Sequence, residues 1–198
     1  MTGNSALGTM FGAGAVETFM GIPRCRDLSR LPARIALIGA DGCTSYPAAG
    51  FHCAGGPAAI RAAAAAYGAS LGHVNFDLGG PVFPGGTDAV DAGDLPQDEA
   101  DPAGNRARIF GAVSQVLDRG GVPFLLGGDD SVPIPMIEAF GARGRPYTIL
   151  QIDAHIDWRD EVGGERLGLS SPIRRASEMG HVERIVQLGC RGIGSARE

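Results

Sequence analysis

The chain has 198 residues, of which 44% are hydrophobic and 6% aromatic, and its 17 Lys and Arg against 22 Asp and Glu give a formal net charge of -5. This apolar content excludes an acidic disordered segment, and the lack of a basic excess argues against a nucleic-acid-binding domain. The 32 Gly and 13 Pro residues then need a use other than disorder. Loops that pass close to a ligand or metal are one such use, because glycine lets the backbone approach and adopt a positive φ.

The sequence also indicates the cellular compartment of the protein. No apolar run approaches the roughly 18 to 20 residues of a membrane span, and residues 1–20 lack a basic segment followed by an apolar core. No C-x-x-C pair occurs among the four cysteines, so we expect reduced, structural thiols. We therefore predict a cytoplasmic protein with no membrane or nucleic-acid partner.

In the first half of the chain, apolar runs that end in glycines alternate with helical patterns. We expect a strand over Arg34–Ile38, a Gly-rich loop over Asp41–Gly56 and an alanine-rich helix from about Pro57 to Tyr67. The prolines and acidic residues of Gly79–Gly104 predict a long surface loop.

The second half continues the alternation. A helix begins at Pro102, with Asp101 as its N-cap, and ends at Gly120. We then expect apolar strands over Val122–Leu126, Tyr147–Ile152 and Val182–Leu188. A short helix over Ser131–Phe140 follows the first of these strands. This order is typical of βαβ units, so we predict an α/β fold with a mostly parallel sheet.

Acidic residues follow two of these strands. Asp129 and Asp130 come after the first, and Asp153, His155 and Asp157 come directly after the second. In an extended segment this alternation places the last three side chains on one side, where they could bind one or two divalent ions. Strand-end turns and helix caps are the structural alternative, above all for one of the two adjacent aspartates. Because parallel strands place ligand sites at their carboxyl ends, we expect the two acidic segments to converge.

These segments carry a family resemblance. Gly127–Ser131 and Asp153–Asp157 resemble the G-G-D-H-S and D-A-H-x-D signatures of the ureohydrolases, the arginase and agmatinase superfamily. Further similarity to agmatinases and their relatives follows in order along the chain, at Thr18–Pro23, Cys43–Tyr46, Gly55–Arg61, Pro172–Ala176 and Leu188–Gly192.

The resemblance implies a single ureohydrolase-like domain over residues 1–198, with a three-layer α/β/α sandwich that assembles as trimers or hexamers. It also implies a cofactor of two divalent ions, Mn²⁺ or in some members Ni²⁺. Asp153 would bridge the ions, Asp157 would bind one and His155 the other, while Asp130 takes the position of the signature histidine. A metal-bridging hydroxide would attack the guanidinium carbon to release urea and an amine.

The sequence departs from the family pattern in three places. Asp130 replaces a histidine, which favours harder, oxygen-preferring ions. Leu169 occupies the position of a histidine thought to help proton transfer, so another carrier would be needed, and His52 is a candidate. The family's S-x-D-x-D-x-x-D-P segment, with two more aspartate ligands, would lie beyond Glu198. The resemblance thus covers the first two thirds of the fold and leaves it incomplete at the C-terminus.

Residues beside the acidic row are candidates for the substrate pocket. Trp158, with Arg159, could contact a guanidinium through a cation-π interaction, and ordinary packing is the alternative. Arg174 and Arg175 would repel a cationic substrate, so we expect them at the helix surface or an oligomer interface.

The leading interpretation is an agmatinase-like, metal-dependent hydrolase that cleaves a linear C–N amidine bond in a small cationic guanidino compound. Agmatine-like amines are favoured over arginine, and guanidinobutyrate, guanidine and an alkyl biguanide stay open. The alternatives are a non-catalytic subunit that pairs with a catalytic chain in a hetero-oligomer, and an inactive fragment with an open sheet edge.

Overall fold

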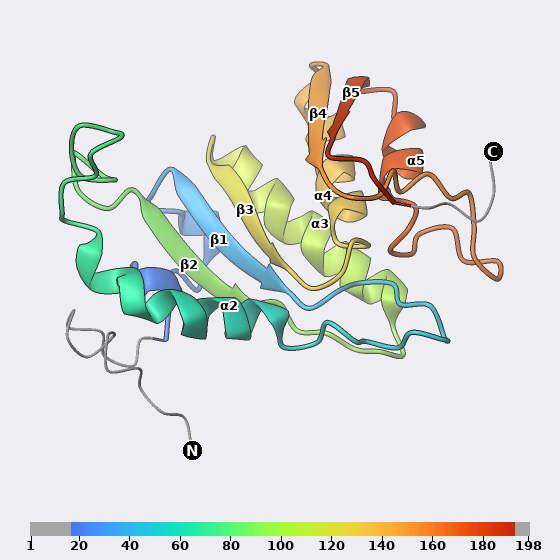
Figure 1. Cartoon of the computed structure of the whole chain (residues 1–198), viewed down its shortest axis with the longest axis horizontal. Coiled ribbons are helices and arrows are strands. Elements are labelled where there is room, and N and C mark those ends of the chain that lie inside the picture. The colour runs from blue at the N-terminus through green and yellow to red at the C-terminus, as the bar shows by residue number, and fades with distance from the viewer. Residues whose placement is uncertain (1–16, 193–198) are drawn as a thin grey trace. The chain divides into compact units, whose positions relative to one another are not determined.

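The computed structural model describes residues 17–192, whose strands and helices alternate along the chain (Figure 1). Most of residues 1–20, where the sequence lacks the pattern of a targeting signal, lies outside the described residues. Contacts divide the chain into two compact units: one takes residues up to 40, 55–95 and 115–126, and the other takes 41–54, 96–114 and 127 onward. Within the described residues, no helix is both long and apolar enough to cross a membrane.

The first unit contains a three-stranded sheet of β1 (Ile35–Ala40), β2 (Ala89–Asp94) and β3 (Val122–Gly127). Its order is β2-β1-β3, so β1 lies in the middle, and β1 and β2 pair in parallel (Figure 1). All residues of β1 after Ile35 are buried. This burial explains why the strand reads as a continuous apolar run.

The predicted surface loop over Gly79–Gly104 was wrong, because it contains β2. Ala89, Val90 and Asp91 are buried, and Asp91 is fully enclosed. The strand carries two aspartates and a glycine in six residues, a composition that disfavours strands. Pairing with β1 and an ion pair in the interior override that local preference.

Helix α2 (Gly56–Ala64) follows the Gly-rich loop and continues as the 3₁₀ helix η3 (Ala65–Ser70), so the α-helical part is shorter than predicted. Short 3₁₀ turns, η1 (Phe19–Gly21) and η2 (Leu28–Arg30), precede the sheet. The apolar core of this unit contains residues from several elements, namely Ile22, Leu37, Ala89 and Leu126.

The second unit holds a pair of parallel strands, β4 (Tyr147–Ile152) and β5 (Val182–Leu188), whose bounds are as predicted. Its helices are α4 (Pro133–Phe140), η4 (Gly141–Arg143) and α5 (Pro172–Ser177). Helix α3 (Pro102–Asp118) precedes β3 and also confirms the predicted element. The α/β class with parallel strands is therefore confirmed.

A buried ion pair joins α2 to β2 in the first unit. Arg61 donates to both carboxylate oxygens of Asp91, over 2.7 Å from Nε and 2.9 Å from Nη2, and it also contacts Asp94. The Asp91 carboxylate accepts two further bonds, from the backbone amides of Phe19 and Gly93. Burial alone would raise the pKa of Asp91, but these hydrogen bonds lower it below its ordinary value. Asp91 is thus ionised and fully paired in the folded chain.

Replacing Arg61 should therefore destabilise the protein strongly. Arg61→Met leaves the Asp91 carboxylate buried without its cation, which costs about 3 to 5 kcal/mol of the free energy of unfolding. Urea unfolding followed by circular dichroism measures the loss. Arg30→Met is the control, because Arg30 faces Asp27 in an exposed pair at 3.7 Å, so its loss should change stability far less. Equal effects of the two substitutions would contradict the role given to the buried pair.

Candidate metal centre

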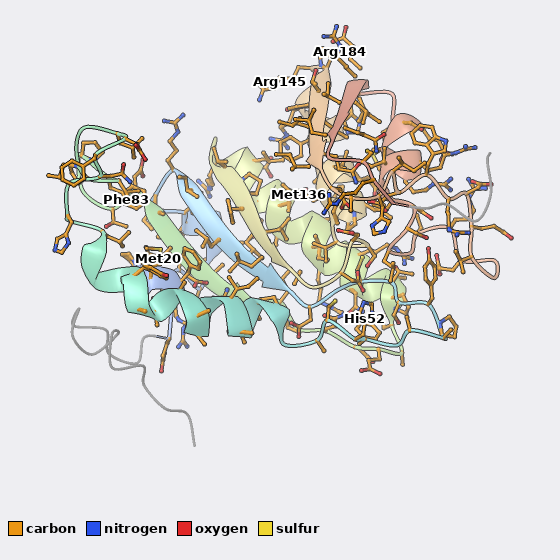
Figure 2. All side chains as sticks on the ribbon, in the orientation of Figure 1. Met20, His52, Phe83, Met136, Arg145 and Arg184 are labelled. Carbon is orange, nitrogen blue, oxygen red and sulfur yellow. The ribbon has the colours of Figure 1, made fainter. Side chains whose placement is uncertain are left out.

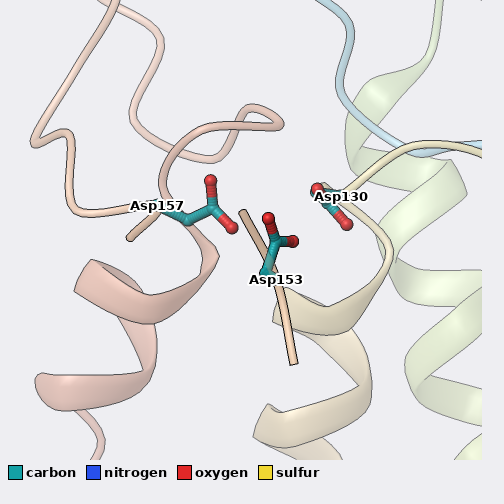
Figure 3. Close-up of side chains that lie close together, drawn as sticks. All are labelled: Asp130, Asp153 and Asp157. Atoms are coloured by element: carbon teal, nitrogen blue, oxygen red, sulfur yellow. The ribbon is translucent and has the colours of Figure 1, made fainter. Parts of the chain in front are cut away.

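Three carboxylates converge in the second unit. Asp130, Asp153 and Asp157 each offer one oxygen, and these oxygens all lie within 4.8 Å of one another (Figure 3). Asp130 lies between β3 and α4, Asp153 directly follows β4, and Asp157 lies four residues further along the chain. Carboxylate oxygens are the ligands that hard divalent cations prefer. The two acidic segments therefore meet as the sequence predicted, and their donor set fits a divalent ion.

Hydrogen bonds fix the turn that presents Asp130. The neighbouring Asp129 carboxylate accepts from the Ser131 amide over 2.9 Å and from the Ser131 hydroxyl. The same hydroxyl oxygen accepts from the backbone amides of Cys43 and Thr44, each over 3.0 Å. Asp129 is thus committed to the turn, which matches the structural alternative for one of the two aspartates. Sequence reasoning missed the part played by Ser131, whose partners lie more than eighty residues away.

The segment after β4 is not extended, so the alternation argument for Asp153, His155 and Asp157 was wrong. Asp157 has a positive φ of 48°, which turns the backbone so that its side chain approaches Asp153. The His155 side chain is 68% exposed, and its Nδ1 lies 3.6 Å from Asp153 Oδ1. His155 therefore lies beside the three carboxylates but does not belong to their compact group.

The backbone after β5 packs against this segment. The amides of Arg191 and Gly192 donate to the Ala154 carbonyl oxygen over 2.8 and 2.7 Å. A Cβ atom at Gly192 would lie 2.5 Å from Cδ2 of His155 and 3.1 Å from the Ala154 carbonyl oxygen, so a larger residue here would displace the exposed His155 ring. The Leu188–Gly192 segment, which resembles the family pattern, thus supports the loop that carries Asp153 and His155.

The carboxylates perturb one another. The pKa of Asp130 is raised to about 6 by loss of hydration and by the charges of Asp157, Asp153 and Asp129. Burial and the charge of Asp153 also raise the pKa of Asp157, while a hydrogen bond from Gln151 opposes the rise. At both residues, repulsion between the carboxylates therefore adds to the effect of burial. A bound cation would relieve that repulsion, which supports the fit between the donor set and a metal.

The other candidate residues are distributed around the unit. Trp158 lines a groove of about 340 Å³ together with Gln187, and the Arg174 guanidinium carbon lies 5.8 Å from the centre of its ring. His52 is exposed on the loop before α2, with Nδ1 3.3 Å from the Gly50 carbonyl oxygen (Figure 2). Leu169 is half-buried. Among residues 17–192 the compact group consists of Asp130, Asp153 and Asp157, so geometry gives neither His52 nor Leu169 a catalytic role.

The expectation that Arg175 lies at the helix surface was wrong. Its side chain is 6% exposed and forms ion pairs with Asp160 at 2.5 Å and Glu178 at 3.1 Å. The two acidic partners supply the compensation that a buried guanidinium needs. The four cysteines are free thiols, as expected, and burial raises the pKa of Cys43 to about 11.

Comparison with known sequences places these features in one family. A profile of the arginase family matches residues 33–198. Guanidinopropionase from Pseudomonas aeruginosa is 33% identical over 186 residues, covering 89% of this chain and 54% of its own length. Mitochondrial agmatinase from Gallus gallus is 30% identical over 178 residues, covering 82% of this chain and 49% of its own length. The chain thus spans about half the length of these relatives.

Solved structures match in the same way. Proclavaminate amidino hydrolase from Streptomyces clavuligerus superposes with a TM-score of 0.73 at 26% identity, over 94% of this chain and 60% of that one. Formiminoglutamase from Trypanosoma cruzi, solved with Mn²⁺, has a TM-score of 0.64 at 23% identity, over 87% of this chain and 57% of that one. These matches confirm the arginase-type α/β fold.

The raised pKa of Asp130 predicts a pH-dependent effect on metal-free stability. In the unfolded chain the carboxyl group titrates near its ordinary value of 3.8, and in the folded chain near 6. Ionisation therefore weakens folding as pH rises through this window, and the penalty is complete above it. Asp130→Asn should stabilise the metal-free protein by about 1 kcal/mol at pH 8, a figure reduced for solvent screening, and should have little effect at pH 3.5.

Thermal unfolding in the presence of a chelator, at both pH values, checks this prediction. Asp98→Asn is the control, since Asp98 lies outside the three-carboxylate group. A stabilisation of Asp130→Asn that is the same at both pH values would contradict the assignment of the repulsion to the ionised Asp130 carboxylate.

Proposed function

Because the chain belongs to the arginase family, we propose that it hydrolyses a small guanidino compound to urea and an amine at a metal centre that includes Asp130, Asp153 and Asp157. The observation that carries this proposal is the convergence of three carboxylates within 4.8 Å. His155, next to Asp153, would complete the ligand set. We extend the proposal to a cytoplasmic protein that assembles as an oligomer.

The chemistry follows from the charge of the site. A bound pair of divalent ions would supply an acidified water as the nucleophile for the guanidinium carbon. Asp153 would hold both ions, Asp157 one and His155 the other. The carboxylates also attract the cationic substrate. Water adds to the carbon, the C–N bond to the alkyl nitrogen breaks, and a proton passes to the departing amine, so that the products are urea and an alkylammonium ion.

The proton needs a carrier, because Leu169 cannot move one. His155 would be bound to an ion through its imidazole, so the carrier would have to be another group. His52, exposed on the loop before α2, is the candidate. The ring of Trp158 faces the guanidinium of Arg174. The guanidino group of a substrate could displace Arg174 and make the same cation-π contact.

A second candidate function is suggested by the number of ligands. Three carboxylates and one imidazole are enough for one ion, whereas two ions in a bridged site need more. A chain that contributes these groups to a centre completed by another polypeptide would also fit the family fold. The number of ions bound per chain distinguishes the two candidates: two for a self-sufficient centre, and one or fewer for a shared one.

Asp153→Ala should abolish both metal binding and urea release. Asp153 is the proposed bridging ligand, so its loss affects both ions at once. The chain is loaded with Mn²⁺, the metal is measured after gel filtration, and urea is measured with agmatine, guanidinobutyrate and guanidine as substrates. Asp77→Ala, at an exposed site in the first unit, is the matched control and should behave as the wild type. Unchanged metal content in Asp153→Ala would exclude the bridging assignment.

Asp130 should bias the centre toward hard ions. Replacing its carboxylate with an imidazole in Asp130→His should raise the affinity for Ni²⁺ relative to Mn²⁺ by about tenfold, because nitrogen ligands suit Ni²⁺ and carboxylates suit Mn²⁺. Competitive titration of each ion against a metal-binding dye gives the two affinities. An unchanged ratio would show that Asp130 does not contact the ion.

A further inference from the structure

Two glutamines on neighbouring strands meet beside the proposed centre. Gln151 of β4 and Gln187 of β5 are partners in the parallel register. Gln187 Nε2 donates to Gln151 Oε1 over 2.5 Å, and Gln151 Nε2 donates to Asp157 Oδ2 over 2.7 Å. A chain of hydrogen bonds thus runs from β5 through β4 to one of the three carboxylates.

The chemistry of the groups fixes the direction of this chain. An ionised carboxylate can only accept, so Gln151 must turn its NH₂ group toward Asp157. Its carbonyl oxygen then faces β5 and needs a donor, which Gln187 supplies. The same Nε2 of Gln187 lies 2.9 Å from the carbonyl oxygen of Ile156. Each glutamine therefore has a single amide orientation that satisfies its partners.

The contacts converge on a residue that has to be held in place. Asp157 is 8% exposed and has a positive φ of 48°, which is uncommon for a residue other than glycine. Gln187 fixes the peptide before it through Ile156, and the Arg174 amide donates to the Asp157 carbonyl oxygen over 3.2 Å. Gln151 then sets the orientation of the carboxylate itself. Both the backbone and the side chain of Asp157 are thus restrained.

We propose that Gln151 and Gln187 are positioning residues, which hold the Asp157 carboxylate in the orientation that binds the cation. This inference rests on the proposed metal centre. A neutral amide suits the task, because it orients the carboxylate without supplying a positive charge. A Lys or Arg at position 151 would neutralise Asp157 and compete with the metal. Hydrogen-bond partners of metal ligands typically contribute in this way to metal affinity.

The test measures Mn²⁺ affinity and metal-free stability separately. Gln151→Met keeps the length of the side chain and removes the donor, so we expect a loss of affinity of about 10- to 100-fold. Free Mn²⁺ is counted by electron paramagnetic resonance during titration of the intact chain. The metal-free melting temperature should stay close to that of the wild type. Gln115→Met, on the exposed side of α3, is the matched control and should change neither quantity.

A second variant tests the connection between the glutamines. Gln187→Met should weaken Mn²⁺ binding in the same direction, and the double variant should lose less affinity than the product of the two single losses, because Gln187 acts partly through Gln151. A lower melting temperature with unchanged affinity would overturn the inference and leave only a structural role. If the two single losses of affinity multiply in the double variant, the glutamines act independently and the proposed connection between them is wrong. If the wild type binds no Mn²⁺, both the metal centre and the inference fail, whereas wild-type binding with unaffected variants contradicts the inference alone.

Discussion

The main physical constraint on the second unit is the repulsion among three closely spaced carboxylates. Asp130, Asp153 and Asp157 lie within 4.8 Å of one another, although like charges at this distance oppose folding. The surrounding hydrogen bonds come from neutral groups: the amide of His155 donates to Asp153, and Gln151 donates to Asp157. These bonds orient the carboxylates without cancelling their charge. The remaining negative charge is therefore available to a cation, which is the physical basis of the proposed centre.

In the first unit, by contrast, the charge of a buried aspartate is compensated within the fold. Asp91 is fully buried, yet Arg61 and two backbone amides lower its pKa. Asp130 and Asp157 have raised pKa values, because burial and the charges of neighbouring carboxylates both oppose their ionisation. An aspartate whose charge is satisfied within the fold contributes to stability, whereas one whose charge is opposed is a candidate for function. The direction of the pKa shift thus separates the two kinds of aspartate in one chain.

Sequence patterns were informative where one local preference dominates. The β4 and β5 strands were predicted to the residue, because their apolar and β-branched runs have polar or glycine boundaries. The acidic β2 strand was missed, since its stability comes from a pairing and an ion pair that lie far apart in sequence. Arg175 was expected at the helix surface or an oligomer interface, whereas it is buried and its guanidinium pairs with Asp160 and Glu178.

The site could be located from the sequence but its geometry could not. The pattern of Asp153 and Asp157 implied an extended row, whereas a positive φ at Asp157 brings the carboxylates together and leaves His155 outside the group. Gln151 and Gln187 carry no local signal, because their meeting depends on the register between β4 and β5. With an aspartate at position 130, the compact group consists of carboxylates alone. Since neutral donors leave that charge uncompensated, the donor set of the proposed centre suits a divalent cation that accepts oxygen ligands, and the fold as well as the ligands sets that preference.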